Sequence, residues 1–134
     1  MLKLNEIEKI ENQLSEIVIN AAIEVHQRLG GPGLLESLYE DALIYELQIR
    51  KISVQSQVLI PVIYKDYTLR EPLRLDLLVD GKIIIEVKAT EKENIIYQTQ
   101  LLTYLRLTRL KLGLVINFGK TRLIDGITRV ANGL

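Results

Sequence analysis

The sequence contains no cysteine and no tryptophan, and only one histidine and one phenylalanine. The absence of cysteine excludes disulfides, thiolate zinc sites and cysteine nucleophiles. Any metal ion would therefore have to bind to oxygen ligands or to His26. Aromatic residues make up only 5% of the chain, which leaves few side chains that could stack on nucleic-acid bases.

Long apolar runs are absent as well. No run approaches the roughly 20 residues that a membrane span needs. The opening stretch MLKLNEIEKIENQ carries acidic residues where a secretory signal would have an apolar core. We therefore expect a cytoplasmic protein with no membrane partner.

The chain has no excess charge of either sign, because 17 basic residues balance 17 acidic ones. A neutral domain lacks the overall field that attracts polyanions, which weakens the case for a nucleic-acid partner. Basic residues nevertheless gather in the last third, at Arg106, Arg109, Lys111, Lys120, Arg122 and Arg129. A local basic face and scattered surface charge both explain this distribution.

The length of 134 residues and the 48% hydrophobic content fit one globular domain spanning residues 1–134. Apolar residues at three- and four-residue steps predict an amphipathic helix over 5–29, which ends at the glycine-rich stretch 30–33. The same spacing predicts a helix over 35–51, with apolar positions Leu35, Leu38, Ala42, Tyr45 and Ile49, and another over 94–110.

Between these helices the pattern changes to the two-residue period of β-strands. We predict strands over 54–64, 73–79, 83–89 and 112–118, a short strand over 121–125 and a frayed tail at ANGL. Asp80-Gly81 marks a hairpin turn between the second and third strands.

Charged residues interrupt the two central strands, as Asp76 in one and as Glu86 and Lys88 in the next. Side chains alternate along a strand, so Glu86 and Lys88 lie on one face, about 7 Å apart. Two carboxylates can hold a hard divalent ion such as Mg²⁺, and a lysine can stabilise developing negative charge. The alternative is a hydrated surface salt bridge. The apolar setting KIIIEVKA favours a functional site, because buried charge is costly.

The predicted site depends on the register of the two strands. A strict two-residue turn at Asp80-Gly81 would pair Asp76 with Ile85 and turn Asp76 away from Glu86. We therefore predict a three-residue loop, a bulge or a sharp bend near Asp76 that brings the two carboxylates together.

Three motifs in order resemble the GxxExxY protein family, a small prokaryotic branch of the PD-(D/E)XK nuclease superfamily. They are Gly33-Leu34-Leu35-Glu36-Ser37-Leu38-Tyr39, Asp76-Leu77-Leu78-Val79 and Glu86-Val87-Lys88. The resemblance covers nearly the whole chain and extends to QLLTYLRLT and KLGLVINF near its end. It implies an α/β fold, with a restriction-endonuclease-like αβββαβ core and a mixed central sheet flanked by helices. The implied site lies within residues 33–126.

The resemblance also implies roles for individual residues. The implied catalytic residues are Asp76, Glu86, Lys88 and Gln100; the metal ligands are Glu36, Asp76 and Glu86; and the supporting residues are Tyr39, Arg74 and Tyr104. Gln100 and Tyr104 form a Q-x-x-x-Y pattern whose spacing places both on one helix face. Core packing of Tyr104, a solvated Gln100 and a dipole-favoured Glu36 in a first helical turn are the structural alternatives.

Two positions stand apart from this pattern. Tyr97 occupies a place where family members often have histidine, which could remove a proton carrier behind the reacting groups. His26 resembles a family histidine, but a lone helical histidine more often packs or caps, and we assign it no catalytic role.

These features predict a Mg²⁺- or Mn²⁺-dependent nuclease that hydrolyses phosphodiester bonds, with DNA favoured over RNA. One alternative is a catalytically silent module that keeps the fold and binds nucleic acid or protein. Another is a structural or regulatory partner that forms a homodimer through the long first helix.

Overall fold

The computed structural model describes the backbone of residues 4–133 and the side chains of residues 10–133. The elements follow in the order α1 (Leu4–Arg28), α2 (Glu36–Ile49), β1 (Val54–Ile60), β2 (Ile63–Tyr64), β3 (Tyr67–Thr68), β4 (Leu73–Val79), β5 (Ile83–Lys88), α3 (Ile96–Thr108), β6 (Leu112–Asn117), the 3₁₀ helix η1 (Leu123–Gly126) and β7 (Ile127–Ala131).

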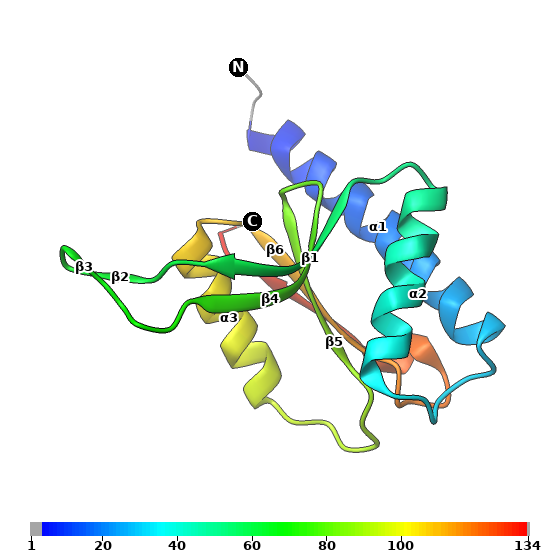
Figure 1. Cartoon of the computed structure of the whole chain (residues 1–134). Helices are drawn as coiled ribbons and strands as arrows, with labels where there is room; N and C mark the ends of the chain where they lie inside the picture. Colours follow the sequence, from blue (N-terminus) through cyan, green and yellow to red (C-terminus); the bar gives the residue numbers. More distant parts are fainter. Residues whose placement is uncertain (1–3, 134) are drawn as a thin grey trace.

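The main sheet has five strands in the order β1-β4-β5-β6-β7. β5 and β6 run parallel, and the other neighbouring pairs are antiparallel. Helices α1 and α2 cover one face of the sheet and α3 covers the other, while the small β2–β3 hairpin projects beyond the sheet (Figure 1). The predicted αβββαβ core with a mixed sheet flanked by helices is confirmed.

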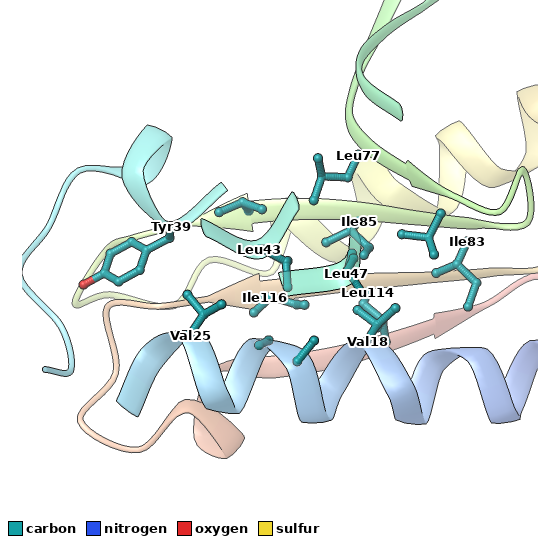
Figure 2. Packing of buried hydrophobic residues seen from close by; sticks show 14 of the residues in the cluster. Val18, Val25, Tyr39, Leu43, Leu47, Leu77, Ile83, Ile85, Leu114 and Ile116 are labelled. Carbon is teal, nitrogen blue, oxygen red and sulfur yellow. The ribbon is translucent and has the colours of Figure 1, made fainter. Parts of the chain in front are cut away.

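The larger hydrophobic core lies between the sheet and helices α1 and α2. Figure 2 shows Val18 and Val25 of α1 and Leu43 and Leu47 of α2 against side chains of β4, β5 and β6. Burial of large aliphatic side chains contributes roughly 1.5–3 kcal/mol each, so this layer provides most of the driving force for folding. We name the side of the sheet that α1 and α2 cover the apolar face.

Helix α2 buries a different stripe from the one that the sequence pattern suggested. Four of the five predicted apolar positions, Leu35, Leu38, Tyr45 and Ile49, are exposed. The residues that enter the core are Tyr39, Leu43 and Leu47, at four-residue steps. The helix is apolar on two sides, and the sequence alone gives no means of choosing between them.

The predicted strand over 54–64 is broken in the structure. β1 ends at Ile60, directly before Pro61, and β2 begins at Ile63 and pairs with β3 instead of β4. Proline provides no backbone donor for a ladder, which explains the break. Lys65, with φ of 56°, lies in the turn between β2 and β3.

The end of the chain also differs from the prediction. The 3₁₀ helix η1 lies where a strand over 121–125 was predicted, and the last strand is β7, paired with β6. Asn132 is held through its backbone and its side chain. The backbone N–H donates to Lys111 O, and the side-chain amide donates to Leu110 O. The predicted frayed tail is therefore wrong up to this residue.

A smaller cluster packs under α3 on the other face, with Leu75, Ile84, Leu101, Leu105 and Val115 as its buried members. This cluster does not extend to the end of β5, where Glu86 and Lys88 follow Ile84 on the same face. We name this side the α3 face. Among the described helices, none is both long and apolar enough to cross a membrane.

Candidate active site

The loop between β4 and β5 sets the register of the site. Val79 pairs with Ile83, so three residues, Asp80 to Lys82, connect the strands. Asp80 and Gly81 adopt positive φ angles of 52° and 64°, and Lys82 N–H donates to Val79 O at 2.9 Å. The predicted three-residue loop is confirmed, and it carries Asp76 to the level of Glu86 instead of Ile85.

The regular ladder stops at this level, and the Asp76 side chain takes over as acceptor. The last paired residues of β4 and β5 are Leu77 and Ile85. Beyond them the Val87 backbone N–H donates to Asp76 Oδ2 at 2.8 Å. This bond ties the Asp76 carboxylate to the strand that carries Glu86.

Glu86 is a buried carboxyl group, with 8% of its surface exposed. Burial first, and then the negative charge of Asp76 and a hydrogen bond shared with its side chain, raise the pKa of Glu86 to about 9. Its Oε1 is buried and has no hydrogen-bond partner among the described residues. An uncompensated buried oxygen beside a second carboxylate is a position that a cation would satisfy.

Lys88 follows Glu86 on the same face, at the end of β5. Its Nζ lies 4.6 Å from the centre of the Tyr97 ring, at the start of α3. Its charge also acts on Glu86, because it lowers the pKa that burial and Asp76 raise. A carboxylate pair and an amine are thus gathered at one end of the sheet.

Glu36 approaches the same place from the first turn of α2. Partial burial raises its pKa; the charge of Lys88 opposes that rise and the charge of Asp76 adds to it. The N-cap residue of α2 is Leu35, which makes no side-chain capping hydrogen bond, and Glu36 is the acidic residue of the first turn. Glu36 therefore belongs electrostatically to the group of Asp76 and Lys88.

Sequence reasoning missed Glu40 and Gln57, which lie beside this group. The Gln57 side-chain amide donates to Glu40 Oε1 at 2.8 Å. Burial raises the pKa of Glu40, the hydrogen bond from Gln57 lowers it, and the charges of Asp76 and Glu36 raise it further. The four-residue step from Glu36 to Glu40 on one helix was the signal available in the sequence.

Comparison with known proteins agrees with this geometry. The family model described as the PD-(D/E)XK nuclease superfamily matches residues 12–130. The chain belongs to the PD-(D/E)XK nuclease superfamily. The comparison with curated proteins gave no match, and neither did the comparison with solved structures.

Not every site residue implied by the resemblance joins the group of Asp76, Glu86 and Lys88 in this PD-(D/E)XK domain. Gln100 is exposed and donates to the Tyr104 hydroxyl at 2.7 Å, so the predicted shared helix face is confirmed. Tyr104 also packs against the cluster under α3. Arg74 is exposed on β4, two residues before Asp76. The catalytic role of Gln100 and the supporting role of Arg74 stay predictions.

Tyr39 and His26 both contact Phe118 in the PD-(D/E)XK domain. The Tyr39 ring stacks on Phe118 with centroids 4.6 Å apart, and its hydroxyl donates to Gly31 O and accepts from Leu34 N–H. His26 Nε2 lies 3.0 Å from Lys120 O. Tyr39 thus pins the glycine-rich loop before Glu36, and His26 is engaged with the backbone.

The oxygen ligands present fit a hard divalent ion, but only in part. Asp76 and the uncompensated Glu86 Oε1 provide carboxylate oxygens of the kind that Mg²⁺ and Mn²⁺ prefer. Within residues 10–133, no group of three or more acidic, histidine or cysteine side chains is arranged to hold a metal. The fit therefore rests on the pair Asp76 and Glu86, and Glu36 stays a predicted third ligand.

Proposed function

We propose that this domain hydrolyses phosphodiester bonds of nucleic acid, with Mg²⁺ or Mn²⁺ held by Asp76 and Glu86 and with Glu36 as a further ligand. The observation that carries the proposal is the buried Glu86 Oε1, which lacks a hydrogen-bond partner among the described residues and lies beside Asp76 and Lys88. PD-(D/E)XK nucleases generally use divalent metals of this kind.

A bound divalent ion would polarise a phosphoryl group and neutralise the charge of the carboxylate pair. The residues of the chain have separate tasks around it. Val87 N–H holds Asp76 in one orientation, and the burial of Glu86 in β5 limits the access of water to its carboxyl group. Lys88 places a positive charge where negative charge develops on the phosphate, and Gln100 helps to orient the substrate.

Several finer features belong to the proposal. We favour DNA over RNA, and we place the chain in the GxxExxY branch because of the motif from Gly33 to Tyr39. A cytoplasmic location and a homodimer through α1 also stay predictions.

A silent binding module is the second candidate function. The observation in its favour is the missing third ligand, since no group of three potential metal ligands is arranged among the described side chains. Such a module would bind nucleic acid or protein without cleaving a bond.

Cleavage assays test the first proposal against the second. Plasmid, linear and single-stranded DNA and RNA are incubated with Mg²⁺, Mn²⁺ or a chelator. We expect metal-dependent cleavage that falls by about 10³-fold in Lys88→Met, since single charge-stabilising donors are worth about that much. Lys65→Met is the matched control, because Lys65 is exposed and lies over the Tyr64 ring of the projecting hairpin.

Binding without cleavage would favour the silent module. Cleavage that survives chelation, or that is equal in wild type and Lys88→Met, would overturn the proposed mechanism. Thermal unfolding of both variants shows whether a lost rate reflects lost chemistry or a lost fold.

A further inference from the structure

Tyr97 lies where its ring can hold the reactive lysine. Lys88 Nζ is 4.6 Å from the ring centroid, within the range of cation–π attraction. We propose that Tyr97 is a positioning residue, whose ring fixes the Lys88 amine at the reaction centre. The inference rests on the proposed function and adds a residue to it.

A lysine at the end of a strand needs such a contact. Its charge sits on a flexible four-carbon stem with three rotatable donors, so its position is set by what it touches. No hydrogen bond or ion pair within 4.0 Å of Lys88 Nζ occurs among the residues that the structure describes. The cation–π contact with the Tyr97 ring is thus the electrostatic contact that the structure gives to this amine.

The backbone around both residues is firmly held, so that the contact is built into the fold. Phe118 N–H donates to Lys88 O at 2.7 Å. The Asn117 side chain then clamps Thr90, accepting from its N–H at 3.0 Å and donating to its carbonyl at 2.9 Å. These bonds fix the chain directly after Lys88.

The other end of the connection is fixed at the start of α3. Asn94 Oδ1 accepts from Ile96 N–H at 3.0 Å, and Asn94 O accepts from Tyr97 N–H at 3.1 Å. Asn94 therefore sets the first turn of the helix and with it the direction of Tyr97. The backbone is therefore held both at Lys88 and at Tyr97, and the amine contacts the ring between these two held segments.

The position of the amine matters because more than one carboxyl group feels its charge. The charge of Lys88 acts on both Glu86 and Glu36. Without the ring, the lysine stem could swing toward the exposed Glu36 and leave the end of β5. Attraction to the ring keeps the amine near Glu86 without neutralising its charge, as an ion pair would.

The test compares Tyr97→Phe, which keeps the aromatic ring, with Tyr97→Leu, which removes it. Tyr64→Leu is the matched control, because Tyr64 carries an exposed contact to Lys65 at 5.6 Å on the projecting hairpin. Protein labelled with ¹³C-lysine gives an ε-methylene signal for Lys88, assigned by its loss in Lys88→Met. We expect the aromatic ring to shift this signal upfield in wild type, in Tyr97→Phe and in the control Tyr64→Leu. The upfield shift should be lost in Tyr97→Leu.

Steady-state kinetics in Mn²⁺ provides the second measurement. We expect kcat to fall about 5- to 30-fold in Tyr97→Leu, with KM changed less than about twofold, and to recover in Tyr97→Phe. If Tyr97 had a purely structural role, Tyr97→Leu would lower the melting temperature, and such a role would not account for the ring-current shift of Lys88. Thermal unfolding of each variant separates these cases.

Four outcomes decide between these possibilities. A wild-type Lys88 signal without an upfield shift overturns the contact, and an unchanged kcat in Tyr97→Leu overturns its role. A Tyr97→Phe variant as slow as Tyr97→Leu overturns the claim that the ring is what matters. If no substrate is cleaved while the ring-current shift is present and is lost in Tyr97→Leu, the nuclease proposal fails and the contact stands.

Discussion

Strand β5 separates two kinds of chemistry by the direction of its side chains. Ile83, Ile85 and Val87 enter the apolar face under α1 and α2, whereas Glu86 and Lys88 follow Ile84 on the α3 face. Helices α1 and α2 cover the apolar face, and α3 covers the other (Figure 1). Stability is concentrated on one face of the sheet, and Glu86 and Lys88 of the candidate site lie on the other.

This comparison implies that the α3 face has a cost in stability at neutral pH, which Glu86→Gln should reveal. The pKa of Glu86 is about 9 in the folded chain, against an ordinary value of 4.5. Between these values the unfolded chain releases a proton that the folded chain keeps, so wild-type stability falls as pH rises from 4.5 to 9. Glu86→Gln should be more stable than wild type at pH 8. The difference in free energy of unfolding between variant and wild type should grow by up to about 4 kcal/mol between pH 5 and pH 8.

Urea unfolding in chelator at a series of pH values measures this difference. Glu16→Gln is the control, because Glu16 is exposed on α1. Added Mg²⁺ should restore wild-type stability at pH 8, since a cation would replace the proton between Asp76 and Glu86. A stability difference that does not change with pH would show that the buried carboxyl has no such cost.

The apolar face should respond to a loss of volume instead. Leu43 is fully buried on α2, so Leu43→Ala should destabilise the fold by about 3 kcal/mol through lost burial and a residual cavity. Leu38→Ala is the matched control on the same helix, where the side chain is 50% exposed, and its effect should be small. Urea unfolding compares the two variants. Equal losses would contradict the assignment of the core to the Leu43 side of α2.

The sequence was informative where one pattern dominated. Strand β4 was predicted with its observed bounds. The requirement that Asp76 meet Glu86 left a three-residue loop, a bulge or a sharp bend, and the structure has the loop. The side of α2 that is buried could not be derived, because Leu38 and Leu43 lie on two competing apolar stripes and only the sheet decides between them.

Long-range contacts at the site were likewise beyond local patterns. Gln57 meets Glu40 across 17 positions of sequence, and Asn117 meets Thr90 across 27. Tyr97 appeared only as a departure from a family pattern, since its contact with Lys88 depends on how the chain between β5 and α3 is folded back. Polar side chains at the ends of apolar strands, such as Asn117, were the local hint available.

The smallest effect concerns Tyr39, a polar link inside the apolar face that bears on the site through Glu36. Its hydroxyl donates to Gly31 O at 2.7 Å and accepts from Leu34 N–H at 3.1 Å. Tyr39→Phe should cost about 1 kcal/mol, because the ring still stacks on Phe118 while both loop groups lose a partner. Faster hydrogen exchange at the Leu34 amide should accompany it.

Tyr45→Phe is the control for this last change, because Tyr45 is 66% exposed on the same helix. Hydrogen exchange and urea unfolding are measured on both variants, together with the cleavage rate. Because the loop leads directly into the first turn of α2, the position of Glu36 should loosen while Asp76 and Glu86 stay in place. A Tyr39→Phe variant that exchanges Leu34 as slowly as wild type would show that this hydroxyl does not hold the loop before Glu36.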